Sequence, residues 1–325
     1  MAQKALILGI AGQDGSYLAE HLLEAGYEVE GVLRRNSTPE HQESRIHHLV
    51  GNVKTYYGDV TDASSIASIL RNSQPDVVYN LAAQSHVRIS FDVPEFTVET
   101  NGVAVMKLLE LIRQNHPTVK LYQASSSEMF GNAVDSDGFQ RETTPMQPVS
   151  PYGCAKLFAY SAIRNYRNAY QLFATNGILF NHESPRRGSN FVTSKVVKSA
   201  VAISRGLEHQ LVLGNLDSFR DWGHARDYVK AIKLMMELPN PVDYVVATGQ
   251  SHSVRELCQI VFSKLGMDYR DFVTQDPKYM RPQELPYLQG DASLIRQTTN
   301  WRPTISFEEM LEEMIESCLA RPGIE

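Results

Sequence analysis

Tyr152 and Lys156 are spaced so that they could move a proton together. Residues four apart on a helix share one face. A lysine ammonium beside a tyrosine favours the phenolate and lowers a pKa that is normally about 10. The tyrosine could then take a proton from a sugar hydroxyl while hydride leaves the same carbon. Ordinary exposed helical pairs have the same spacing. The pattern therefore indicates catalysis only together with other motifs in the chain.

The segment 124–128 follows a predicted strand and adds further reactive groups. A serine hydroxyl there could bond the sugar oxygen that becomes a carbonyl. Glu128 could remove a proton next to the new carbonyl and then, as an acid, help hydroxide leave the next carbon. Dehydrogenation and epimerisation need no such second base. The alternative for Glu128 is a loop carboxylate that faces water.

Gly9, Gly12 and Gly15 stand between a short apolar run at 5–8 and a helical pattern at 16–25. Glycines allow a tight turn and let the backbone approach a pyrophosphate, which the following helix N-terminus favours through its partial positive charge. Turns use glycine routinely. The strand before the turn and the helix after it favour a dinucleotide site.

The end of the second predicted strand, at 28–33, indicates which dinucleotide binds. An acidic residue there would bond the ribose 2′-hydroxyl of NAD, but the sequence has Arg34 and Arg35. Two arginines can clamp a 2′-phosphate, so NADP is favoured over the alternative of a solvated basic turn. Asp59, after the third strand, could accept a hydrogen bond from adenine, cap a helix, or do both.

Strand-like and helix-like patterns alternate through the first half of the chain, which predicts an α/β fold with a doubly wound parallel Rossmann-type sheet. Ligands of such sheets lie at the carboxyl ends of the strands. Asp59–Val60 and Leu81–Ser85 should therefore border the cofactor. The predicted strands cover 5–8, 28–33, 53–57, 76–79, 120–124 and 173–180, and the helices cover 16–25, 63–71 and 94–115.

The regular alternation of strand-like and helix-like patterns ends after Asn181. We expect a loop at 185–188, a helix over 190–205, a further strand at 244–247, and capping boxes at 253–256 and 306–309. We predict an NADP-binding domain of residues 1–180 plus about 221–250. A smaller interwoven α/β domain of about 181–220 and 251–325 should bind the substrate.

Composition excludes several other classes. The formal net charge of −6 argues against broad attraction to nucleic acid or anionic membranes. No apolar stretch reaches the roughly 20 residues that span a bilayer. The cysteines are scattered and no signal peptide is recognisable, so we expect a cytoplasmic protein. The histidines at 86, 182 and 224 lack ligand spacing, and we expect no metal.

Longer strings in the chain resemble the GDP-mannose 4,6-dehydratase family of extended short-chain dehydrogenase/reductases. The similarity runs from about residue 4 to Trp301-Arg302-Pro303. NHESPRRG at 181–188 and RDWG at 220–223 are specific, whereas YxxxK and GxxGxxG are shared with many relatives. The other matching strings are GQDGS at 12–16, AAQSHV at 82–87, YQAS at 122–125, SPYG at 150–153, NFVT at 190–193 and Arg281-Pro282.

The resemblance implies catalytic roles for four residues. Tyr152 is the base at the C4 hydroxyl, Lys156 supports it, and Ser126 bonds the C4 oxygen. Glu128 handles the C5 proton and the loss of water at C6. The product is a 4-keto-6-deoxy sugar nucleotide, with hydride returned internally through tightly bound NADP. GDP-mannose is the expected substrate.

The resemblance also implies the binding residues, with His182 and Arg187 near the cofactor and Arg187 joining Arg35 at its phosphate. Family members are dimers or tetramers, so we expect a homodimer or homotetramer in which 34–38 reaches a neighbour's cofactor. The cofactor set is Gly9, Gly12, Gln13, Asp14, Gly15, Arg34, Arg35, Asp59, Val60, Leu81, Ala82, Ala83, Ser85, Tyr152, Lys156, His182 and Arg187. The GDP-sugar set is Ser85, Asn181, Val192, Lys195, Arg220, Arg281 and Glu284.

The sequence departs from the family pattern at three places. Ser126 stands where threonine is usual, and Phe96 where tyrosine is common. The stretch 132–141 matches poorly and is a candidate border of the sugar site.

Three other functions compete with this interpretation. They are a dehydratase of another GDP sugar such as GDP-mannoheptose, a sugar-nucleotide 4-epimerase or 4-keto reductase, and a regulatory binding protein that has lost catalysis. Epimerases and reductases commonly lack the glutamate at position 128. Binding proteins usually lose the tyrosine or the lysine, and both are present here.

Overall fold

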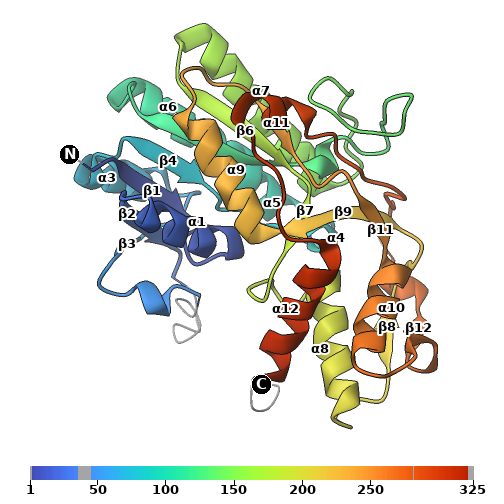
Figure 1. The fold of residues 1–325 in the computed structure, drawn as a ribbon. Coiled ribbons are helices and arrows are strands. Elements are labelled where there is room, and N and C mark those ends of the chain that lie inside the picture. Colours follow the sequence, from blue (N-terminus) through green and yellow to red (C-terminus); the bar gives the residue numbers. More distant parts are fainter. Residues whose placement is uncertain (1, 36–44, 281, 321–325) are drawn as a thin grey trace.

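A seven-stranded parallel sheet forms the centre of the computed structural model, which describes residues 2–35, 45–280 and 282–320 (Figure 1). The strand order is β10-β6-β5-β4-β1-β2-β3. From β1 the chain adds β2 and β3 on one side, and then β4, β5, β6 and β10 on the other side. This arrangement confirms the doubly wound fold. The strands in this order are Tyr244–Val246, Ala174–Leu179, Lys120–Ser126, Val77–Asn80, Lys4–Leu8, Glu28–Leu33 and Lys54–Tyr57.

Helices cover both faces of this sheet, as its buried strands require. On one face, α1 (Gln13–Glu24), α9 (Ala225–Glu237) and α11 (Ser293–Thr299) share a core with the sheet, to which Leu18 and Ile232 contribute. On the other, α3 (Ala63–Ser73), α6 (Ala104–Asn115) and α7 (Pro151–Tyr170) bury Ile69, Leu109 and Ile163.

The single helix predicted over 94–115 is interrupted. It consists of α5 (Pro94–Val98), a π-helical turn η2 (Glu99–Val103) and α6. Gly102 lies against α7 in this turn, where an added Cβ would approach Phe158 to 3.2 Å. The turn carries Asn101, whose amide accepts from the backbone N–H of Gln84 at 2.9 Å and donates to the carbonyl of Gln84 at 2.8 Å. The π-turn therefore fixes the loop that follows β4.

A second, smaller layer has its own core. Strands β7 (Asn181–Glu183), β9 (Phe219–His224) and β11 (Ser251–Ser253) form one sheet, and β8 (Leu211–Leu213) pairs with β12 (Val273–Gln275). Helices α8 (Val192–Ser204), α10 (Val254–Lys264) and α12 (Phe307–Leu319) pack around Trp222 and lie together below the main sheet in Figure 1. We propose that this layer and the main sheet correspond to the two predicted domains.

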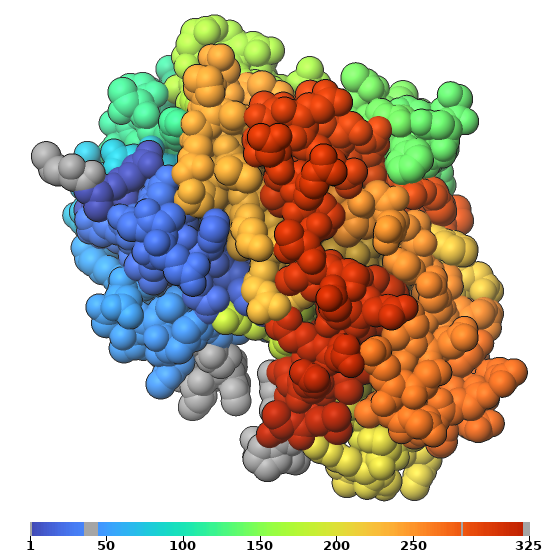
Figure 2. Space-filling view, in the orientation of Figure 1, coloured from blue at the N-terminus to red at the C-terminus, as the bar shows by residue number. Residues whose placement is uncertain are grey.

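The C-terminal part of the chain joins the two layers. Figure 2 shows it, in orange to red, extending over one face from the main sheet to the smaller layer. Trp301 donates its indole N–H to the carbonyl of Asp227 in α9 at 2.8 Å. Thr304 and Ile305 donate backbone N–H groups to the Asp227 carboxylate at 2.7 and 3.0 Å. Asp227 therefore anchors the segment that leads into α12.

Only one of the two predicted capping boxes is complete. Ser306 and Glu309 form both reciprocal hydrogen bonds at the start of α12. Ser253 caps α10 by accepting from the backbone N–H of Glu256, but the Glu256 carboxylate contacts His252 Nδ1 at 3.0 Å instead. The second box therefore has the serine bond without the reciprocal glutamate bond.

The short elements complete the description. They are α4 (Val87–Ser90), η1 (His47–Leu49), η3 (Ser127–Met129), η4 (Tyr269–Asp271) and η5 (Pro277–Tyr279). Within the described ranges, no helix is long and apolar enough to cross a membrane.

Candidate active site

A cavity of about 590 Å³ opens at the carboxyl ends of β4, β5 and β6, where the two layers meet. The chain leaves the main sheet here: Phe180 still bonds to Val246 of β10, and Asn181 already pairs with Trp222 of β9. Residues from both layers therefore face one space. Those that were predicted from the sequence and line it are Asp14, Leu81, Ala83, Ser85, Ser126, Glu128, Tyr152, Lys156, Asn181, His182, Arg187, Val192, Lys195, Arg220 and Glu284.

Tyr152 and Lys156 lie in the first turns of α7. Ser150 caps this helix by accepting from the backbone N–H of Gly153 at 3.0 Å. Tyr152 is held by its own backbone N–H, which donates to Ser90 Oγ at 3.2 Å. Lys156 Nζ lies 5.7 Å from the centroid of the Tyr152 ring and donates to the carbonyl of Ala124 at 2.8 Å.

The expected lowering of the Tyr152 pKa is absent from this structure. Burial raises the pKa of Tyr152 to about 12, and a hydrogen bond with Ser126 opposes that rise. Burial also lowers the pKa of Lys156 to about 8, against the attraction of Asp14. Removal of the phenol from water is thus the largest influence on the Tyr152 pKa, and the Lys156 ammonium is directed to a backbone carbonyl. The Ser126 bond nevertheless places that hydroxyl beside the phenol.

Glu128 lies in η3 directly after β5, and its side chain is buried. Its backbone N–H donates to Ser126 Oγ at 3.2 Å. Its charge acts on Tyr152 by adding to the burial that raises the tyrosine pKa. Ser126, Glu128, Tyr152 and Lys156 therefore face the same space from β5, η3 and α7, which is the arrangement needed for proton transfers on one small substrate.

The turn before α1 is shaped to receive a pyrophosphate. Gly9 has φ +85°, and an added Cβ would lie 3.0 Å from the backbone nitrogen of Ala82. An added Cβ at Gly15 would lie 2.3 Å from the Gly9 carbonyl oxygen. The N-cap of α1 is Gly12, which has no side chain to occupy the helix N-terminus. The backbone N–H groups there can bind an anion, so these residues fit a dinucleotide.

Asp14 and His182 form a partly buried charged pair between α1 and β7. His182 Nε2 lies 2.8 Å from Asp14 Oδ2, and Nδ1 lies 2.7 Å from the carbonyl oxygen of Phe180. Both neighbours are acceptors, so both ring nitrogens donate and the imidazole is charged. Burial lowers the pKa of His182, but Asp14 outweighs this and the net pKa is raised. Burial likewise raises the pKa of Asp14, yet His182 brings it to about 2.

Gln13 strengthens the same junction. Its Nε2 donates to the carbonyl of His182 at 3.1 Å, and its Oε1 accepts from Ser184 Oγ at 2.8 Å. The predicted cofactor residues Gln13 and Asp14 thus connect the glycine-rich turn to β7.

Arg34 and Arg35 are exposed at the end of β2 and do not line the cavity. The Arg34 guanidinium carbon lies 5.8 Å from the centroid of the Phe96 ring, one of the positions that depart from the family pattern. Asp59 does not cap α3: it accepts from the backbone and hydroxyl of Thr61 at 2.9 and 2.7 Å. Asp62 is the cap instead. The roles of the two arginines and of Asp59 and Val60 toward a cofactor stay predictions.

The opposite wall of the cavity carries the predicted GDP-sugar residues. Arg220 of β9 donates to the carbonyl of Leu285 at 2.8 Å, which links β9 to the segment that carries Glu284. Lys195 of α8 donates to the carbonyl of Val212 at 2.7 Å and lies 4.6 Å from the Tyr279 ring centroid. Arg281 lies outside the described residues, as does most of the 34–38 loop.

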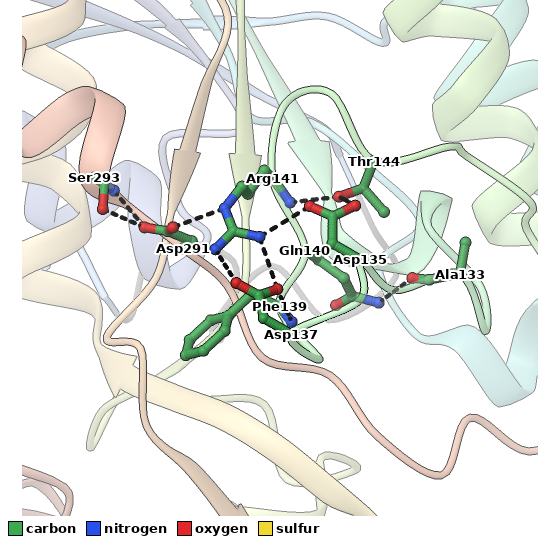
Figure 3. A network of polar contacts seen from close by, with 9 residues as sticks. All are labelled: Ala133, Asp135, Asp137, Phe139, Gln140, Arg141, Thr144, Asp291 and Ser293. Atoms are coloured by element: carbon green, nitrogen blue, oxygen red, sulfur yellow. Dashed lines mark hydrogen bonds and ion pairs between the residues drawn. The ribbon is translucent and has the colours of Figure 1, made fainter.

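None of residues 132–141, the stretch predicted as a candidate border of the sugar site, lines the cavity. Figure 3 shows the reason: Arg141 forms ion pairs with Asp135, Asp137 and Asp291 at 2.9, 2.6 and 2.8 Å. Gln140 pairs with the backbone at 289–291. These bonds hold the loop against the segment before α11.

Three residues at the site were missed by the sequence analysis. Asn101 supports the loop after β4. Thr193 donates a hydrogen bond to Glu183, which forms an ion pair with Arg187. The string that contains Glu183 was noticed, but nothing in its spacing showed that this side chain turns inward. Within the described ranges, no cluster of histidine, cysteine or acidic residues is arranged to hold a metal ion.

Comparison with known proteins adds independent findings. A family model described as GDP-mannose 4,6 dehydratase matches residues 6–314. GDP-mannose 4,6 dehydratase of Cricetulus griseus is 47% identical, over 96% of this chain and 90% of that protein. The Vibrio cholerae protein of that name is 44% identical, over 97% and 93%. The structure of dTDP-glucose 4,6-dehydratase from Bacillus anthracis in complex with NAD superposes with a TM-score of 0.83, at 23% identity over 97% of this chain and 96% of that one, and so shares the fold.

Proposed function

The chain belongs to the GDP-mannose 4,6-dehydratase family, and from this we propose that it converts GDP-mannose to GDP-4-keto-6-deoxymannose and water with NADP as its cofactor. The observation that carries the proposal is the grouping of Ser126, Glu128, Tyr152 and Lys156 around one cavity. A tyrosine and lysine alone would serve a dehydrogenase. The buried carboxylate beside them supplies the second proton transfer that dehydration needs.

The cofactor would lie across the carboxyl ends of β1, β2, β4 and β5. The N-terminus of α1 would hold the pyrophosphate, Arg34 and Arg35 would hold the 2′-phosphate, and Lys156 would contact the nicotinamide ribose. When bound, NADP supplies reversible hydride acceptance, so the overall reaction is redox-neutral. The arginines after β2, in place of an acidic residue, support NADP over NAD.

Tyr152 takes the proton of the C4 hydroxyl as that carbon is oxidised, and Ser126 bonds the same oxygen. The ketone acidifies the C5 proton, which Glu128 removes. Glu128 then gives this proton to the C6 hydroxyl, which leaves as water. Bound NADP would supply the hydride taken from C4 to C6 of the resulting enone. C5 would regain one proton, which matches the one that Tyr152 took from the C4 hydroxyl. Atoms and electrons balance, because the C4 carbon is oxidised and the C6 carbon is reduced.

The opposite wall fits the nucleotide. Lys195 and Arg220 are cations suited to a diphosphate, and the Glu284 carboxylate suits the two N–H donors of the guanine edge. We also propose a homodimer or homotetramer, which light scattering of the full chain would measure.

The test is turnover of GDP-mannose by the purified chain, followed by nucleotide-sugar chromatography. We expect the 4-keto-6-deoxy product from the wild type. Glu128→Gln should still oxidise C4 but should form no dehydrated product, whereas Glu316→Gln, an exposed glutamate on α12, should behave as wild type. Normal dehydration by Glu128→Gln would refute the role of that residue. Faster turnover of another GDP sugar, such as GDP-mannoheptose, would refute GDP-mannose as the preferred substrate.

A further inference from the structure

Arg187 is held in an unusual way at the junction of the two layers. It ends the turn that follows β7, where its backbone N–H donates to the carbonyl of Ser184 at 2.9 Å. Its guanidinium carbon lies 3.5 Å from the centroid of the Phe191 ring. The side chain lines the cavity together with Asp14 and Tyr152. Its charge opposes the burial that raises the Tyr152 pKa, so the guanidinium acts close to the reacting groups.

Glu183, four residues earlier, contacts only one edge of that guanidinium. Its Oε2 lies 2.9 Å from Arg187 Nε. The same oxygen accepts from the hydroxyl of Thr193 at 2.5 Å. The Glu183 side chain is 2% exposed, and Thr193 is fully buried in the first turn of α8. Burial raises the pKa of Glu183, and Arg187 and Thr193 oppose that rise. The carboxylate therefore depends on Arg187 as its counter-charge.

The arrangement leaves the other edge of the guanidinium available. One face rests on Phe191, and the Nε edge lies against Glu183 in an ion pair whose geometry is not that of a hydrogen bond. Within the described part of the chain, neither Nη1 nor Nη2 forms a hydrogen bond with protein. A guanidinium binds phosphate best through two parallel N–H groups in a fixed fork. Here the orientation of the fork is set by Phe191 and Glu183, which line the same cavity.

We infer that Glu183 is a positioning residue, which fixes Arg187 so that its Nη edge binds a phosphate of the dinucleotide. The inference rests on the proposed function, because it takes a dinucleotide as the ligand. Glu183 lines the same cavity, but its side chain is only 2% exposed and its Oε2 faces Arg187 and Thr193. We therefore expect its effect on binding to pass through Arg187.

This dependence can be measured by a double-mutant cycle on ligand affinity. Calorimetric titration of the full chain with NADP⁺ should show about tenfold weaker binding for Glu183→Gln, because one charge-assisted hydrogen bond loses its alignment. Arg187→Met should weaken binding at least as much. The double variant should bind no more weakly than Arg187→Met alone. Additive losses in the double variant would overturn the inference.

Two further measurements exclude simpler explanations. Thr193→Val keeps the volume of the site but removes one bond to Glu183, and should weaken NADP⁺ binding about threefold, as part of one hydrogen bond is lost. If Glu183→Gln does not fold, Thr193→Val replaces it in the double-mutant cycle with Arg187→Met. Titration with GDP should be unchanged in all these variants. Loss of GDP affinity with NADP⁺ affinity intact would overturn the assignment to the dinucleotide.

The outcomes also separate this inference from the proposed function. A wild type that binds NADP⁺ and dehydrates GDP-mannose, combined with unchanged NADP⁺ affinity of Glu183→Gln, would refute the positioning role alone. A wild type that binds no nicotinamide dinucleotide would refute both.

Discussion

Replacement of His182 by glutamine should destabilise the folded chain in a pH-dependent way. The pKa of Asp14 is lowered from 3.8 to about 2, chiefly by His182 acting against burial. One pKa unit corresponds to about 1.4 kcal/mol, so the ionised Asp14 contributes roughly 2 kcal/mol to the free energy of unfolding above pH 4. A neutral glutamine can still bond Asp14, but it removes the nearer positive charge and leaves the carboxylate with Arg187 alone.

The pH dependence follows from the two groups. The lowered pKa of Asp14 gives a contribution that is present above pH 3.8 and is lost as the pH falls through about 2. The raised pKa of His182 gives a contribution that is present below pH 6.5 and is lost as the pH rises through the folded-state value. The pair therefore stabilises most between about pH 4 and 6.5.

Urea unfolding of wild type and His182→Gln at about pH 5.5, 7 and 9 tests this window. The free-energy difference should be roughly 2 kcal/mol at the lowest of these pH values and should shrink toward the highest. His209→Gln, at an exposed position after α8, is the matched control and should show no such trend. A difference between wild type and His182→Gln that stays constant across the series would refute the charged pair.

Three further changes have expected outcomes. Gly15→Ala places a Cβ 2.3 Å from the Gly9 carbonyl oxygen, so it should cost about 1–3 kcal/mol of stability and weaken NADP⁺ binding. Calorimetry that shows unchanged NADP⁺ affinity would contradict the role of the glycine-rich turn in binding the dinucleotide. Asn101→Ala removes both amide bonds to Gln84, and urea unfolding should show a loss of about 1–3 kcal/mol. Arg141→Met breaks a partly exposed ion-pair network, so it should cost no more than about 1 kcal/mol and leave kcat unchanged; a large fall in kcat would place the loop at the sugar after all.

Much of the main sheet follows from local sequence patterns. The predicted strands at 5–8 and 28–33 match β1 and β2 closely. The first is apolar throughout, as a parallel strand buried on both faces requires. The expected strand at 244–247 joins β6 at the sheet edge. Parallel strands end at one edge of their sheet. This rule predicts that Tyr152, Lys156 and Glu128 lie near one another.

The remaining features depend on contacts that sequence spacing does not encode. The π-turn at Asn101 depends on how closely Gly102 approaches α7. The inward position of Glu183 depends on the chain changing sheets after Phe180. The pKa of Tyr152 is governed by burial, which the four-residue spacing to Lys156 cannot report.

The central claim is that one bound substrate is oxidised at C4 and reduced at C6 within a single turnover. GDP-mannose labelled with deuterium at C4 tests it most directly, with the product analysed by NMR and mass spectrometry. The account predicts deuterium at C6 of the 4-keto-6-deoxy product without added reductant. A dehydrated product that carries no deuterium at C6 would contradict it.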